Sequence, residues 1–187
     1  MRRVGGAPRG ARAGGGPEIR AASVADPGGT GSATVVAVGN EDILSMAAKA
    51  MGVDAKINRV NTDLAGIQEN ALNLVHLDNL QPDAFTYGKV DGVCGRAAFE
   101  YIALGVDLAM QGKVDALATT PINKESLKAG GVPYIGHTEI LADLTGSHDP
   151  LTMFQVHELR VFFLTRHLSL AAACKAVTRE RVLDYIR

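Results

Sequence analysis

The sequence predicts an α/β fold with a mostly parallel sheet in three layers. Residues 33–39 form a continuous run of small and β-branched side chains, which is typical of a strand buried on both faces. Apolar residues with helical periodicity follow at 41–51 and again at 90–110, before another apolar run at 114–119. This alternation of strands and helices predicts right-handed crossovers between parallel strands.

The composition indicates a globular protein with neither a nucleic-acid nor a membrane partner. The chain has 187 residues, 47% of them apolar, which is enough for one domain with its own core. The net charge is −1 with both signs spread along the chain, whereas nucleic-acid binding needs a basic face. No apolar run reaches the length of a membrane span, and the N-terminus has arginines but no apolar region like that of a secretory signal. Cys94 and Cys174 lie among small apolar residues, so we expect buried, reduced thiols and a cytoplasmic protein.

The first 32 residues have a different character from the rest of the chain. They are rich in glycine, arginine and proline and show no hydrophobic periodicity. A glycine-rich turn at 28–31 could cradle a phosphate only if it were held between a strand and a helix. We therefore expect residues 1–32 to be an irregular N-terminal segment and residues 33–187 to form the α/β region.

Glycines mark the ends of the expected helices in the first half of that region. Gly52 can stop the helix that follows the first strand, and Gly112 can stop the long helix 90–110. The long helix has an apolar surface broad enough to be buried on more than one side. His76 stands alone in a short apolar strand, and we expect a structural role for it. The expected strands of this half are 33–39, 54–60 and 72–77, and the expected helices are 41–51 and 90–110.

Turn and capping residues organise the second half. Pro121 ends the strand 114–119, and either Thr120 or Asn123 can cap the short helix that follows. The last expected helix starts at Thr178 and is still running at residue 187, from which we expect that the chain is cut short. The remaining elements are strands at 151–156 and 158–164 and helices at 124–129, 137–144 and 170–177.

Polar side chains gather where these strands stop and helices start, which is where open α/β sheets bind ligands. Lys124 suits a phosphate or carboxylate as a point charge, although a solvated lysine would look the same. His137 and Thr138 either simply begin a helix or hydrogen-bond an anionic ligand at its N-terminus. His167 follows a strand and is either a metal ligand or a structural histidine, and one histidine cannot make a metal site alone.

Three segments in combination resemble one enzyme family. They are Ala-Thr-Thr-Pro-Ile-Asn-Lys at 118–124, the stretch 129–146 around Gly-His-Thr-Glu, and Leu-Arg-Val-Phe-Phe-Leu-Thr-Arg-His-Leu-Ser-Leu at 159–170. They strongly resemble the 4-hydroxythreonine-4-phosphate dehydrogenases of pyridoxal phosphate biosynthesis, a family that includes the related 4-phospho-D-threonate and 4-phospho-D-erythronate dehydrogenases. The resemblance covers roughly residues 33–187.

The resemblance implies a truncated version of the isocitrate and isopropylmalate dehydrogenase fold, with two domains, an active site in the cleft and a homodimer. It implies NAD or NADP and a divalent metal, which could be Zn, Mg, Co or Mn. His137 and Thr138 match the pair that contacts substrate, and His167 matches the first of three metal-binding histidines. Lys124 is a possible phosphate contact without a matched family role. No catalytic or cofactor-binding residue can be assigned.

Two departures from the family pattern limit what the resemblance implies. The opening strand and its Gly-Asp-Pro-Ala-Gly-type turn are missing, and only Gly-Pro-Glu-Ile at 16–19 matches. The C-terminal part of the family, with the other two metal histidines and most of the dinucleotide site, is also absent. We therefore expect that this chain alone neither binds metal tightly nor turns over substrate.

The favoured activity is NAD- and metal-dependent oxidation, with decarboxylation, of a phosphorylated hydroxy acid such as 4-phosphooxy-L-threonine. Oxidation of 4-phospho-D-threonate or 4-phospho-D-erythronate is a close alternative, towards which the segment Phe-Phe-Leu-Thr-Arg-His at 162–167 leans. Phosphate acetyltransferases resemble the same fold family and need neither NAD nor metal, so a transferase is an alternative of another class. An inactive truncated fragment is the third alternative. In every active case the partner is a small phosphorylated molecule.

Overall fold

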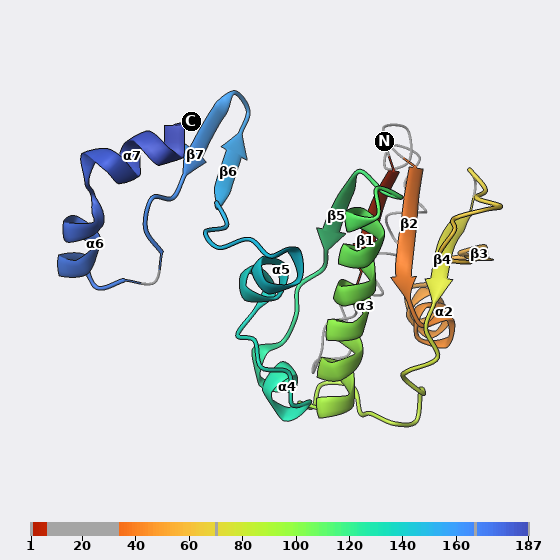
Figure 1. The fold of residues 1–187 in the computed structure, drawn as a ribbon. Helices are drawn as coiled ribbons and strands as arrows, with labels where there is room; N and C mark the ends of the chain where they lie inside the picture. Colours follow the sequence, from red (N-terminus) through yellow and green to blue (C-terminus); the bar gives the residue numbers. More distant parts are fainter. Residues whose placement is uncertain (1, 7–33, 70, 167, 187) are drawn as a thin grey trace. The chain divides into compact units, whose positions relative to one another are not determined.

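The computed structural model describes residues 2–6, 34–69, 71–166 and 168–186 and divides the chain into two compact units (Figure 1). The first unit ends at Ser147 and the second runs from His148 to Arg187. This boundary lies inside the region 33–187, which we expected from the sequence to be one α/β region. Each unit is described by itself below.

The first unit is built on a five-stranded sheet, and the strands are parallel as the sequence predicts. The strands lie in the order β3-β4-β2-β1-β5, and all four neighbouring pairs are parallel. Their bounds are β1 Arg2–Gly6, β2 Thr34–Gly39, β3 Ile57–Val60, β4 Leu72–His76 and β5 Ala116–Thr119. The helices of this unit are α2 Glu41–Ala50, α3 Gly92–Met110, α4 Lys124–Ala129 and α5 His137–Thr145. The observed ends differ from the expected ones by up to three residues.

The N-terminal strand corrects the expectation that residues 1–32 are irregular. Arg2–Gly6 form β1, which lies between β2 and β5 in the sheet. Its register pairs Gly6 with Val38 on one side and with Thr119 on the other. The sequence Arg-Arg-Val-Gly-Gly has one apolar side chain and weak strand propensity, so pairing on both sides replaces the missing local signal. The expected irregular residues 7–32, with the glycine-rich turn at 28–31, lie outside the described residues.

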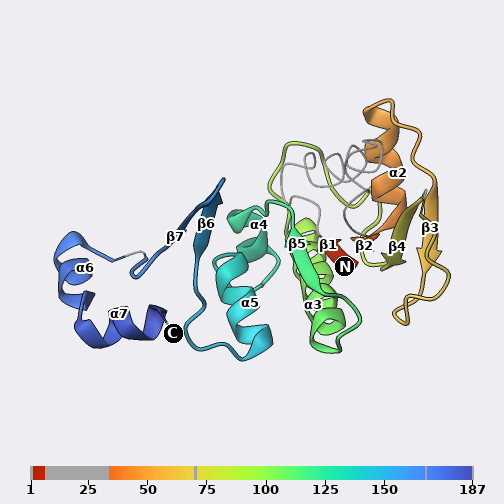
Figure 2. The same ribbon diagram turned by 90° about the horizontal axis from the view of Figure 1, so that it is seen from above.

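Helices cover both faces of the sheet and make the predicted three layers (Figure 2). Alternate residues of β2 point to opposite faces. On one face Val36 and Val38 belong to the main core, which includes Tyr101 and Ile102 of α3. On the other face Ala37 packs with Leu44 of α2 and with two leucines of β4. The central strands β2 and β4 are therefore buried on both sides, which is why their sequences are nearly continuous apolar runs.

The second unit contains a β-hairpin and two helices. The antiparallel strands β6 (Met153–Val156) and β7 (Leu159–Phe162) are joined by a turn in which His157 has a φ of 51°. Ser169 caps α6 (Leu170–Ala176), and Thr178 caps α7 (Arg179–Ile186) through a bond from the Arg181 amide.

The two cysteines have different environments. Cys94 is buried as expected, but Cys174 on α6 is exposed, which corrects the prediction for that residue. Small neighbours do not show which side of a short helix is covered. In the part of the chain that the structure describes, no helix is both long enough and apolar enough to cross a membrane.

Candidate functional site

The candidate site is built on the loop that leaves the carboxyl end of β5. Thr120 follows the strand and is 6% exposed, and Pro121 restricts its backbone to extended conformations. Asn123 is the residue that caps α4, because its side-chain oxygen accepts a hydrogen bond from the Ser126 amide at 2.9 Å. Lys124 is therefore the first residue of a helix whose start is fixed by its cap.

Glycines of α3 fix the position of α4. A Cβ atom added at Gly95 would lie 1.9 Å from the Ser126 carbonyl oxygen, and one at Gly92 would lie 2.7 Å from the Ala129 carbonyl oxygen. Only residues without a Cβ allow the two backbones to approach this closely. Ser126 is fully buried, and its hydroxyl accepts a hydrogen bond from the Asp91 amide at 3.2 Å. The direction in which α4 presents its side chains is set by these contacts.

Lys124 lies beside the start of α5. Its Cε atom is 3.9 Å from the position that a Cβ of Gly136 would take, and Gly136 is the N-cap residue of α5. Gly136 has no side chain that could cap this helix, so within the described part of the chain the first amide groups keep their capacity to bind an anion. Within the described residues Lys124 forms no ion pair. An ammonium group and uncapped amides therefore share one small region.

His137, the first residue of α5, faces back towards the end of β5. The backbone carbonyl of Thr120 accepts a hydrogen bond from its ring. The Nε2 atom is buried and has no hydrogen-bond partner among the described residues, so the donor to Thr120 is Nδ1. Burial lowers the pKa of His137 from its ordinary value of 6.5, and the bond to Thr120 opposes that shift. His137 is therefore mostly neutral at pH 7.

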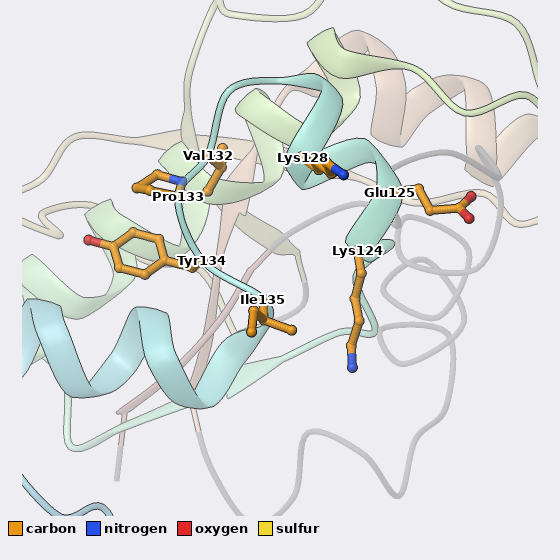
Figure 3. Close-up of a pocket in the computed structure, with 7 residues that line it drawn as sticks. All are labelled: Lys124, Glu125, Lys128, Val132, Pro133, Tyr134 and Ile135. Atoms are coloured by element: carbon orange, nitrogen blue, oxygen red, sulfur yellow. The ribbon is translucent and has the colours of Figure 1, made fainter. Parts of the chain in front are cut away.

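A pocket of about 420 Å³ lies between α4 and the loop before α5 (Figure 3). Lys124 extends from the start of α4 beside Ile135, and the ring of Tyr134 lies on the side of Ile135 away from Lys124. The Tyr134 ring stacks on Phe99 with 5.7 Å between centroids, and its hydroxyl donates to the Asp143 carboxylate. That hydrogen bond raises the pKa of Tyr134. The residues that line the pocket are Lys124, Glu125, Lys128, Val132, Pro133, Tyr134 and Ile135.

The structure brings together three of the four residues that the sequence singles out. Lys124 and His137 both lie next to Gly136, and Thr138 is half-buried in the first turn of α5. His167 lies outside the described residues, so its role as a metal ligand stays a prediction. Among the residues that are described, no three His, Cys, Asp or Glu side chains group together to hold a metal.

Sequence reasoning did not identify Lys128 and Tyr134 as part of the site. Lys128 could have been found from its spacing, because it lies four residues after Lys124 and residues four apart share one face of a helix.

The structural role expected for His76 is confirmed, because its Nδ1 atom accepts a hydrogen bond from the Glu41 amide at 3.1 Å.

Comparison with known families gives one match over most of the chain. The sequence model for the pyridoxal phosphate biosynthetic protein PdxA matches residues 31–187. A protein of Fusobacterium nucleatum named "Putative D-threonate 4-phosphate dehydrogenase" is 52% identical over 180 residues. A protein of Halalkalibacterium halodurans with the same name is also 52% identical. The alignments cover 96% of this chain but 54% of each relative, so the chain spans about half the length of these curated relatives.

Comparison with solved structures also gives matches to dehydrogenases. A 4-hydroxythreonine-4-phosphate dehydrogenase from Burkholderia phymatum superposes with a TM-score of 0.87 at 31% identity, covering 98% of this chain and 56% of that one. One from Klebsiella pneumoniae has a TM-score of 0.84 at 31% identity, covering 97% and 54%. A terephthalate 1,2-cis-dihydrodiol dehydrogenase from Burkholderia xenovorans, at 21% identity and a TM-score of 0.68, shares the fold. The predicted dehydrogenase-like fold is confirmed by these superpositions.

Proposed function

Because the chain belongs to the PdxA family of pyridoxal phosphate biosynthetic proteins, we propose that it forms the substrate-binding part of a dehydrogenase for phosphorylated hydroxy acids. The observation that carries the proposal is the convergence of Lys124, His137 and Thr138 beside the uncapped start of α5. An ammonium group and free amides suit a phosphate, while a threonine hydroxyl and an imidazole suit the hydroxy-acid part of the same molecule. The two curated relatives are named as D-threonate 4-phosphate dehydrogenases, the two solved structures at 31% identity are named as 4-hydroxythreonine-4-phosphate dehydrogenases, and none of the four is named a transferase.

We assign the phosphate of the substrate to Lys124 and the first turn of α5. The Cε atom of Lys124 is held near Gly136, so its ammonium group can reach an anion bound at the helix start. Lys128 lies one turn farther along α4 and lines the pocket from the same helix. Two cations with no ion-pair partner among the described residues favour an anionic ligand in this region.

NAD or NADP is the proposed hydride acceptor, and a divalent cation would polarise the hydroxyl oxygen that is oxidised. The described residues supply no set of three metal ligands, so we assign no step of the reaction to a metal held by them. His167 stays a predicted ligand. The homodimer, which rests on the resemblance, and the cytoplasmic location, which rests on the reduced cysteines, are further proposals.

Between the two substrates, we propose D-threonate 4-phosphate (4-phospho-D-threonate). The relatives named for this substrate are 52% identical over nearly the whole chain, whereas the hydroxythreonine phosphate dehydrogenases of known structure are 31% identical. This reverses the order of preference drawn from the sequence, in which 4-phosphooxy-L-threonine came first.

A chimera tests the proposal, since this chain spans about half the length of its relatives. Residues 1–187 replace the matching part of the Fusobacterium nucleatum relative, and NADH formation is followed with each substrate, with and without Mg²⁺ or Zn²⁺. We expect higher kcat/KM with D-threonate 4-phosphate than with 4-phosphooxy-L-threonine. The parent relative, assayed in parallel, shows that the assay works. A folded chimera that oxidises neither substrate, while the parent is active, would contradict the proposal.

The phosphate assignment has its own test in the same chimera. Lys124→Gln should raise KM for the phosphorylated substrate by about tenfold, because it removes a charge-assisted contact. Lys128→Gln is the matched control, since it removes the same charge one helical turn away and should raise KM less. Equal effects of the two changes would show that Lys124 acts only through the general field of the surface.

A further inference from the structure

The second unit has no core of its own among the described residues. No described side chain between His148 and Ile186 is buried, and neither α6 nor α7 has a buried residue. The described hydrophobic side chains that are buried end in sequence at Ile140, in the first unit. A segment as short as 148–187 rarely folds stably without a core or another staple. The stability of this unit therefore depends on a surface against which it can pack.

One face of the β6–β7 hairpin is entirely apolar. Phe154 lies opposite Val161 and Val156 lies opposite Leu159, and opposite residues share one face of an antiparallel pair. The ring of Phe163 meets that of Phe154 edge to face, with 5.1 Å between the centroids. These five side chains, which we call the apolar hairpin face, are 37–65% exposed. Contiguous exposed apolar side chains of this kind mark surfaces that contact another molecule.

Polar contacts fix the base of the hairpin. The Arg166 guanidinium donates hydrogen bonds to the Thr152 hydroxyl and to the Pro150 carbonyl, both at 2.9 Å. The Nε atom of Arg181, on α7, donates to the Leu164 carbonyl at 3.0 Å. The chain is thus held on both sides of the hairpin, immediately before β6 and after β7. The apolar hairpin face is therefore presented as an ordered surface.

The outer edges of the hairpin indicate the class of partner. β6 and β7 form a two-stranded sheet and pair with no other described strand (Figure 1). Each strand therefore presents one edge of backbone N–H and C=O groups with which a strand of another polypeptide can pair. A lipid surface or a small apolar ligand offers no such ladder of partners. The partner is therefore a polypeptide that brings both a strand and an apolar surface.

The length of the relatives indicates which polypeptide this is. The two curated relatives align with 96% of this chain over only 54% of their own length, and the Burkholderia phymatum structure superposes on 98% of this chain with 56% of its own. Each therefore has a counterpart of the hairpin and, in addition, a long region without a counterpart here. A second copy of this chain fits less well. One two-fold contact covers one patch, whereas the hairpin, α6 and α7 are all uncovered.

We propose that the apolar hairpin face docks the region of the relatives that this chain does not match, and that a strand of that region extends the β6–β7 sheet. The second unit is then one part of a domain whose core forms only when that region is present. This inference rests on the family and on the exposed hairpin, and it does not depend on the proposed substrate.

Capture of the unmatched region as a separate polypeptide tests the proposal. The tagged 187-residue chain is co-expressed with the unmatched region of the Fusobacterium nucleatum relative, and the amount that co-purifies is measured. Phe154→Asp places a carboxylate in the apolar hairpin face and should lower the captured amount at least about tenfold. Gln155→Asp is the matched control, because it adds the same carboxylate at the next position of β6, on the opposite face, and should lower capture less. The urea midpoint of the first unit should be the same in both variants.

Equal losses of capture in the two variants would overturn the proposal, as would no capture of a soluble unmatched region by the unsubstituted chain. A homodimer of the chain alone that Phe154→Asp dissociates would also overturn it, since the face would then belong to a second copy.

Hydrogen exchange gives a second measurement, in which the unmatched region is joined to the chain in the chimera. The backbone amides of β6 and β7 should exchange about 100-fold or more slowly in the chimera than in the 187-residue chain, whereas those of β2 should be protected in both. Equal exchange of the hairpin amides in the two proteins would overturn the proposal. Because neither experiment measures catalysis, the proposed function would stand.

Discussion

The contact between α3 and α4 makes Gly95→Ala the most informative substitution for the position of the site. The added Cβ atom would lie 1.9 Å from the Ser126 carbonyl oxygen and 2.6 Å from the Leu127 nitrogen. Because both of these are backbone atoms, no side-chain rotation can relieve the clash. The helix must move by at least about 1.1 Å to restore an allowed separation. Ser126 and Leu127 are fully buried, so that movement opens the core beneath them.

The expected loss of stability follows from two opposing terms. Overpacking by one methyl group costs about 1–3 kcal/mol, and a backbone clash this short belongs at or above the upper end of that range. Alanine has a higher helix propensity than glycine, which offsets about 1 kcal/mol. We therefore expect the free energy of unfolding of the first unit to fall by about 2 kcal/mol or more.

Urea unfolding followed by far-UV circular dichroism measures this difference. Gly39→Ala is the matched control, because its Cβ would lie 3.8 Å from Leu44 and 3.9 Å from Leu74, at ordinary contact distances. The control should change the unfolding midpoint little. If Gly95→Ala were as stable as Gly39→Ala, the glycines of α3 would not be what positions α4, and the account of how Lys124 is placed would fail.

Two further predictions concern buried polar groups of the first unit. Tyr101 is fully buried and its hydroxyl donates to the Asn79 side-chain oxygen at 2.7 Å, so Tyr101→Phe should lower the free energy of unfolding by about 1–2 kcal/mol. An unchanged urea midpoint for Tyr101→Phe would contradict this prediction. Burial lowers the pKa of His137 below 6.5, so at lower pH the unfolded chain takes up this proton first. As the pH is lowered from 6.5 to the folded-state pKa, the free energy of unfolding should therefore decrease. His137→Asn should remove this part of the pH dependence, which urea midpoints measured across the same pH range would show. An equal pH dependence in this variant would show that other groups cause it.

Helices and strands that are specified by the pattern of their own residues could be predicted from the sequence. The apolar runs of β2 and β4 and the long apolar helix α3 follow from side-chain pattern, and α4 begins where its cap and the preceding proline predict. The strand β1 could not be predicted, because its pairing with β2 and β5 depends on residues far along the chain. Its five residues offer one apolar side chain, which is too little for any local rule.

The residue types of the candidate site could be predicted from the sequence, but their arrangement could not. The polar residues of the β5 loop and of the start of α5 are visible as a cluster at the ends of elements. The hydrogen bond from the His137 ring depends on the position of the Thr120 backbone carbonyl, which the residue types do not reveal. The pocket depends on how closely α4 approaches α3, which the glycines allow but do not by themselves predict.

NADH formation by the chimera of residues 1–187 with the Fusobacterium nucleatum relative is the decisive experiment for the proposed function. We predict oxidation of D-threonate 4-phosphate, a KM about tenfold higher for Lys124→Gln, and no oxidation of unphosphorylated D-threonate. Equal activity on D-threonate with and without its phosphate would contradict the claim that this chain binds phosphorylated hydroxy acids beside α4 and α5.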